Sequence, residues 1–126
     1  MNIKNELNSL IGKQIICAND TQLICQGKNG ETVDISFYAD NVDCGYAEVT
    51  RELFFEPNNK NNPVITDWEF AGGDRDNSCR VELTFFGLKK PLVKYDLECG
   101  SGSGWHYGAA ITVVFDNLKE VRVCEW

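Results

Sequence analysis

His106 is the only histidine of the chain, so a Ser-His-Asp or Cys-His mechanism would have to use it. It stands between Trp105 and Tyr107, directly after a Gly-Ser segment at residues 100–104. A single histidine among aromatic residues is more typical of packing or hydrogen bonding than of catalysis, and one imidazole cannot form a histidine-rich metal site. We therefore expect no catalytic centre, and an enzyme that uses His106 is the least favoured alternative.

Two other segments have the composition of ligand-binding loops. Phosphate-binding loops present backbone N–H groups at the start of a helix, but segment 100–104 precedes β-branched residues and no lysine follows it directly. We interpret it as a hairpin connection. Segment 74–77 (Asp-Arg-Asp-Asn) lacks the glycine and the terminal glutamate of a calcium loop. The sequence therefore predicts neither a metal site nor a cofactor.

The six cysteines do not indicate a disulfide framework. No two have the C-x-x-C spacing of redox or zinc motifs, and the first residues do not form a secretory signal. Cys79 and Cys99 each continue an alternating apolar pattern, which is typical of small buried side chains. We expect reduced thiols and a cytoplasmic protein.

Alternation of apolar and polar residues predicts short strands along most of the chain. Residues 46–55 are compatible with either a strand or a helical turn, and residues 57–63 and 72–77 are predicted to be loops or turns. Asn29-Gly30 is typical of a tight hairpin turn. The predicted strands cover residues 14–18, 22–26, 33–37, 64–70, 79–86, 92–99, 107–115 and 118–124.

One short helix is predicted at the N-terminus, because Ile3, Leu7, Leu10 and Ile11 recur at helical spacing before Gly12. Together these elements predict a mainly β fold, α+β at most. We expect an antiparallel sandwich or curved meander of about 7–9 strands, with the helix against one face or edge. The length of 126 residues fits a single domain, 1–126.

The net charge of −7 is unevenly distributed along the chain. Residues 31–76 contain eleven acidic and three basic residues, a net charge of −8, whereas residues 1–30 have +1 and residues 77–126 have zero. This balance argues against nucleic acid as a partner, because phosphates require a basic face. It also argues against an anionic membrane surface, and no apolar run approaches the roughly 20 residues that span a bilayer.

The acidic middle segment predicts a surface for a basic protein partner, although such a segment is also typical of a solvated face that maintains solubility. Aromatic residues would supply the buried anchors of an interface. The candidate acidic contacts are Asp40, Asp43, Glu48, Glu52, Asp67, Glu69, Asp74 and Asp76. The candidate aromatic anchors are Tyr46, Trp68, Trp105 and Tyr107.

Residues 110–123 (AITVVFDNLKEVRV) have a strand, a phenylalanine, a short turn and a second strand. In this ending the chain resembles bacterial immunity proteins of polymorphic and contact-dependent toxin systems. Residues 10–15 (LIGKQI) and 37–44 (FYADNVDC) are similar to segments of small bacterial and phage proteins. The first resemblance implies a small, acidic, non-enzymatic protein that inhibits one cognate toxin, which we expect to be a basic nuclease domain. The alternative is a small phage- or host-encoded module that binds another protein or a small ligand.

Overall fold

The computed structural model describes residues 3–43, 46–57, 61–74, 78–100, 107–116 and 119–125. These residues form one helix and nine strands. The elements are α1 (Ile3–Asn8), β1 (Gln14–Ala18), β2 (Gln22–Gln26), β3 (Thr32–Asp43), β4 (Tyr46–Leu53), β5 (Asp67–Asp74), β6 (Ser78–Gly87), β7 (Lys90–Gly100), β8 (Tyr107–Phe115) and β9 (Lys119–Glu125).

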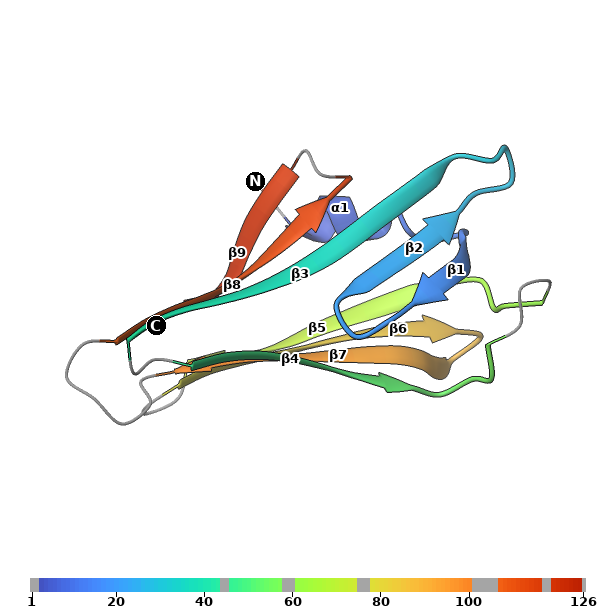
Figure 1. Ribbon diagram of the computed structural model, residues 1–126. Helices are drawn as coiled ribbons and strands as arrows, with labels where there is room; N and C mark the ends of the chain where they lie inside the picture. Colours follow the sequence, from blue (N-terminus) through green and yellow to red (C-terminus); the bar gives the residue numbers. More distant parts are fainter. Residues whose placement is uncertain are drawn as a thin grey trace.

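The strands form two antiparallel sheets that pack face to face (Figure 1). Sheet A has the order β1-β2-β3-β8-β9, and sheet B has the order β4-β7-β6-β5. This arrangement confirms the predicted mainly β fold with one short N-terminal helix.

The chain passes from sheet A to sheet B between β3 and β4. The ambiguous residues 46–55 form a strand over most of their length, because Tyr46 to Leu53 pair with Gly100 to Val93 of β7. The preceding strand is longer than predicted and runs to Asp43, where it pairs with Tyr107 of β8. The chain thus leaves sheet A at the end of β3 and enters sheet B at the start of β4.

The hydrophobic core lies between the two sheets. Its position accounts for the alternation of apolar and polar residues along the strands. In β6 the side chains of Cys79, Val81, Leu83 and Phe85 are buried, while those between them are more exposed. Because successive side chains of a strand point to opposite faces, the intervening residues form the outer face of sheet B.

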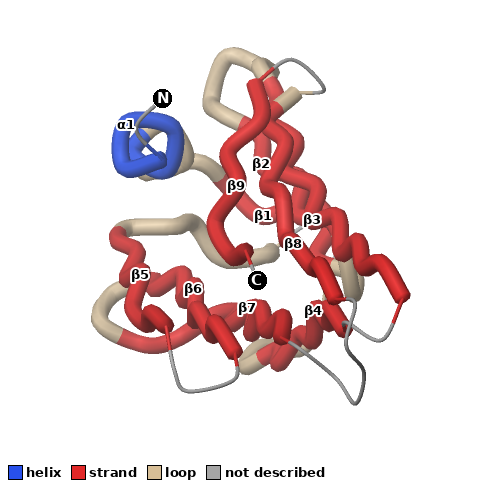
Figure 2. The backbone as a smooth tube through the Cα atoms, turned by 90° about the vertical axis from the view of Figure 1, so that its left-hand side faces the viewer, coloured by secondary structure: helices blue, strands red, loops and turns tan. Residues whose placement is uncertain are grey.

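Helix α1 covers the side of the sandwich between β9 and β5 (Figure 2). Leu7 of this helix and Leu10, which follows it, are fully buried. The Nε1 of Trp68 in β5 donates a hydrogen bond to Oδ1 of Asn8 (2.9 Å). The helix ends at Asn8 rather than at Ile11, because N–H groups of residues 9–11 bond to carbonyls three residues back, as in a tightened last turn.

Three further strand boundaries differ from the prediction. Val64 forms only an isolated bridge with Gln14, so β5 begins at Asp67. Residues 72–74, predicted as a turn, belong to β5 and pair with β6, since hydrogen bonding to the neighbouring strand outweighs the turn preference of glycine. Pro91 lies within β7, and only residues 88–89 separate it from β6. No helix in the described part of the chain is long and apolar enough to span a bilayer.

Alkaline solution is expected to destabilise this fold, because two buried groups resist ionisation. Burial raises the pKa of the Cys25 thiol from 9.0 to about 12 and raises the pKa of the Tyr95 hydroxyl above 10.0. Above pH 9.0 the unfolded chain loses the Cys25 proton that the folded chain keeps. The free energy of unfolding therefore falls, by up to about 1.4 kcal/mol per pH unit for each group.

Urea unfolding measured between about pH 8 and about pH 11 checks this expectation. The wild type should lose stability progressively above the ordinary thiol pKa, whereas Cys25→Ala should lose it less steeply. Equal slopes in the two proteins would show that Cys25 does not retain its proton.

Candidate functional site

Charged side chains stand in rows across the outer face of sheet B. The strand register places Glu48 of β4, Glu98 of β7 and Arg80 of β6 side by side. The neighbouring rows hold Thr50, Asp96, Glu82 and Ala71, and then Glu52, Lys94, Thr84 and Glu69. We define the acidic face as seven outward carboxylates, those of Glu48, Glu52, Asp67, Glu69, Glu82, Asp96 and Glu98.

Two cations stand among these carboxylates within the described residues. Arg80 donates from Nε and Nη2 to the two oxygens of Asp96 (3.0 and 2.5 Å). This hydrogen bonding, followed by the attraction of the Asp96 charge, raises the pKa of Arg80 above its ordinary value. Arg80 and Lys94 both lie 3.4 Å from Oε1 of Glu82. Arg80 is thus engaged with Asp96 and Glu82, and Lys94 with Glu82.

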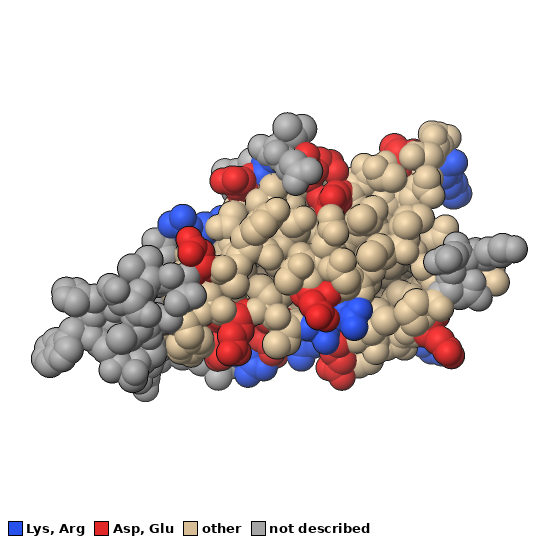
Figure 3. All heavy atoms as spheres, in the orientation of Figure 1, with Lys and Arg blue, Asp and Glu red and all other residues tan. Residues whose placement is uncertain are grey.

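The remaining carboxylates of the acidic face keep an unbalanced charge. Seven carboxylates against two cations leave a net charge of −5. Glu48, Glu52, Asp67, Glu69 and Glu98 form no ion pair with any residue in the described ranges. Figure 3 shows charged side chains along the lower margin of the molecule, over sheet B.

Four of the eight predicted acidic contacts lie on the acidic face: Glu48, Glu52, Asp67 and Glu69. Asp40 is exposed on the outer face of sheet A, opposite Ala110 of β8, because β3 belongs to the other layer. Asp43 and Asp74 end β3 and β5, but their side chains are outside the described set, and Asp76 is outside the described residues.

The predicted aromatic anchors are not gathered in one place. Tyr46 is half-buried and lies on the same side of β4 as Glu48, two residues away. Trp68 packs against the core from the inward side of β5, so it is not an anchor on the acidic face. Tyr107 begins β8 without a described side chain, and Trp105 and His106 lie outside the described residues.

Sequence reasoning missed the contribution of the electrically neutral residues 77–126. Arg80, Glu82, Asp96 and Glu98 all belong to β6 and β7, whose residues form the middle of the acidic face. The outward direction of these side chains could be predicted from the sequence, because each alternates with a buried residue. Their position beside β4 could not be predicted, since it depends on the pairing of strands far apart in the chain.

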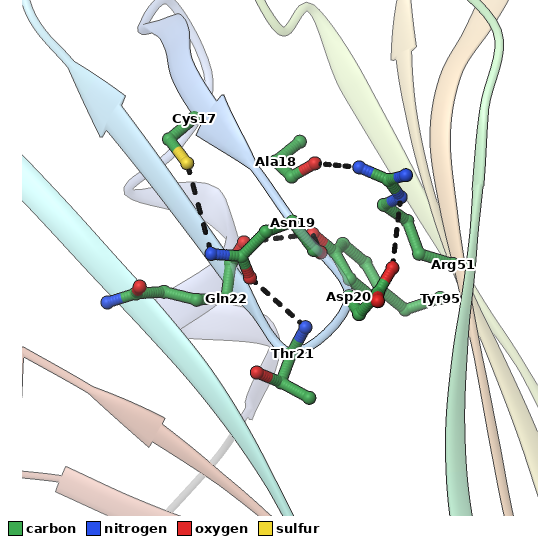
Figure 4. A network of polar contacts seen from close by, with 8 residues as sticks. All are labelled: Cys17, Ala18, Asn19, Asp20, Thr21, Gln22, Arg51 and Tyr95. Carbon is green, nitrogen blue, oxygen red and sulfur yellow. Dashed lines mark hydrogen bonds and ion pairs between the residues drawn. The ribbon is translucent and has the colours of Figure 1, made fainter.

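Arg51, the single cation of β4, points away from the acidic face and into the opening between the sheets (Figure 4). Its guanidinium donates to the backbone carbonyl of Ala18 and lies 3.8 Å from Oδ1 of Asp20 in the β1–β2 turn. The hydroxyl of Tyr95 from β7 reaches the same turn and bonds to the carbonyl of Asn19 (3.0 Å). Arg51 thus fastens sheet B to sheet A and leaves β4 without a cation on its outer side.

The described residues contain no group of three or more metal-ligating side chains. Comparisons with protein-family models, curated proteins and solved structures found no match to this chain. What the acidic face provides chemically is a negatively charged sheet surface, with a hollow of about 220 Å³ between Glu48, Thr50, Arg80, Asp96 and Glu98.

Proposed function

We propose that this protein is a non-enzymatic inhibitor that covers a basic surface of another protein with its acidic face, as an immunity protein covers its cognate toxin. The observation that carries the proposal is the gathering, on one sheet face and from two distant parts of the chain, of carboxylates that form no ion pair with another described residue. Glu48 and Glu52 come from β4, and Glu98 comes from β7. We place the protein in the cytosol, where thiols such as those of Cys17 and Cys25 remain reduced.

The charge of the acidic face acts on the encounter with a partner and on the orientation of the two proteins. A face with a net charge of −5 attracts a positively charged partner and repels anionic competitors. A nuclease fits this chemistry, because its substrate-binding surface must be basic to hold phosphates. A protein that occupies such a surface blocks the substrate without any catalytic group of its own.

The test is co-expression with the toxin domain encoded next to this gene, with cell survival as the readout. We expect the wild type to restore growth and to bind the purified toxin domain. Toxicity that persists, together with no binding, would overturn the inhibitor role. A gene neighbourhood without a toxin reading frame would also contradict it.

Charge reversal on opposite faces tests the surface. Glu48→Lys with Glu52→Lys is expected to slow association about tenfold or more at low salt and to weaken its salt dependence. Asp40→Lys with Glu120→Lys changes the net charge equally on the outer face of sheet A, where both side chains are exposed. The second pair should have a much smaller effect. If it slows association as much as the first pair does, then the acidic face is not the docking surface.

A further inference from the structure

The turn between β6 and β7 holds Leu88 in a backbone conformation that leucine rarely adopts, and it exposes this apolar side chain to solvent. Leu88 and Lys89 have φ angles of +52° and +69°, the two positive values of a type I′ turn. Asparagine and glycine favour these positions, because other side chains are strained there. Leu88 is also 84% exposed, the highest fraction among the large apolar side chains that the structure describes.

Thr66 holds this turn in place from the start of the neighbouring strand. Its Oγ1 accepts a hydrogen bond from the N–H of Leu88 (3.0 Å) and donates to the carbonyl of Phe86 (3.3 Å). Its own N–H donates to the same carbonyl (2.8 Å). These three hydrogen bonds fix the position of the turn that carries the exposed Leu88.

A hollow of about 450 Å³ lies beside Leu88, at one end of the acidic face. Its apolar lining includes Phe86, which is the cross-strand neighbour of Asp67. Its charged lining is Asp67 and Glu69, which are two residues apart on β5 and therefore on the same side of the strand, together with Lys89 of the turn. Two carboxylates against one ammonium group leave the hollow with a net charge of −1. The complete lining is Thr66, Asp67, Trp68, Glu69, Phe86, Leu88 and Lys89.

We propose that this hollow receives a lysine side chain of the partner protein. The aliphatic stem lies along Leu88 and Phe86, and the ammonium group lies beside Asp67 and Glu69. This inference rests on the proposed function, because it assumes a partner with a basic surface. It adds an apolar anchor to the charge attraction, and the partner covers the exposed leucine.

Lysine fits better than arginine for a geometric reason. Oδ1 of Asp67 already accepts a hydrogen bond from the N–H of Trp68 (2.8 Å), so a guanidinium that binds both oxygens of Asp67 would have to share Oδ1 with that N–H. A compact ammonium has three rotatable donors and can divide them between two separate carboxylates. Lysine stems also pack readily along apolar surface.

The probe is the peptide acetyl-Gly-Lys-Gly-amide, titrated into the 15N-labelled protein and followed by amide chemical shifts. A control peptide carries 2,4-diaminobutyrate, which has the same charge on a stem that is shorter by two methylenes. Since a buried methylene strengthens binding about fourfold, the control should bind at least fourfold more weakly. Shifts should concentrate at residues 66–69 and 86–89.

Two variants separate the parts of the site. Leu88→Asn suits the positive φ, so the melting temperature should not fall, yet the lysine peptide should bind at least fourfold more weakly. Asp67→Asn with Glu69→Gln should also weaken binding, whereas Asp40→Lys with Glu120→Lys, on the outer face of sheet A, should leave the pattern of shifts unchanged.

Equal binding of the two peptides, unchanged affinity of Leu88→Asn, or shifts spread evenly over β4 and β7 would overturn this inference. Tighter binding of the corresponding arginine peptide would also do so. These results are independent of the survival assay. Loss of rescue with the lysine site intact would refute the inhibitor role alone, and rescue without peptide binding would refute the lysine site alone.

Discussion

Replacing Tyr95 by alanine is expected to lower the free energy of unfolding by about 3–5 kcal/mol, the range for removal of a large buried aromatic side chain. Tyr95 is fully buried, and its ring centroid lies 4.4 Å from that of Phe37 in the opposite sheet. The substitution therefore leaves a cavity between the two layers. It also removes the hydroxyl that holds the β1–β2 turn.

The hydroxyl and the ring can be separated experimentally. Tyr95→Phe keeps the ring and removes the hydroxyl, which lies within hydrogen-bond distance of the carbonyls of Asn19 (3.0 Å) and Gln22 (3.2 Å), so it should cost only about 1 kcal/mol. Gln22 keeps a partner for its carbonyl, because that oxygen also accepts from the N–H of Asn19 (2.9 Å). Chemical denaturation measures both variants. Tyr38→Ala, on the exposed outer face of sheet A, is the control and should change stability by less than about 0.5 kcal/mol.

A cost near that of the control for Tyr95→Ala would mean that the two layers can close around the missing ring. A loss of several kcal/mol for Tyr95→Phe would place most of the energy in the turn rather than in the core. Either result would contradict the packing that the structure describes.

Replacing Gly72 by alanine is expected to cost at least about 2 kcal/mol, because strain and overlap act together. Gly72 has a φ angle of +136°, and a Cβ atom there would lie 2.1 Å from the carbonyl oxygen of Arg80. It would also lie 2.8 Å from Cα of Val81. Since both neighbours are backbone atoms of β6, the overlap can be relieved only by moving β5 away from β6.

Gly30→Ala is the matched control for Gly72→Ala. Gly30 has a φ angle of +87°, but no atom lies within 4 Å of its added Cβ. This variant should therefore show only the backbone cost, about 1 kcal/mol. Thermal unfolding distinguishes the two variants. Equal losses would contradict the close approach of β5 to β6.

Much of the fold follows from local pattern. Residues 79–86 alternate between small or large apolar side chains and polar ones, and β6 extends from Ser78 to Gly87. The boundaries of β8 agree with the predicted 107–115, because β-branched residues and a following turn mark its limits. The ends of β3 and β5 did not follow local pattern, since cross-strand pairing with β8 and β6 extends them through residues of low strand preference.

The candidate site was less predictable than the strands. The negative charge in the sequence lies in residues 31–76, but the acidic face takes Glu82, Asp96 and Glu98 from the neutral segment that follows. Asp40 is not part of the acidic face, because it lies on the other sheet. Arg51 is not part of it either, because its side chain points inward. Charge summed along a chain therefore located only part of the charge on the surface.

The sequence by itself determined that the chain forms short antiparallel strands with one apolar side and one polar side, because that information lies in the two-residue period. It also determined an excess of acidic residues. Only the tertiary structure decided which polar sides share a face. Strand order sets that choice, and β7 pairs with β4 although the chain between them is long. The same pairing turns scattered carboxylates into the acidic face, and the close association of β5 with β6 forms the hollow beside Leu88.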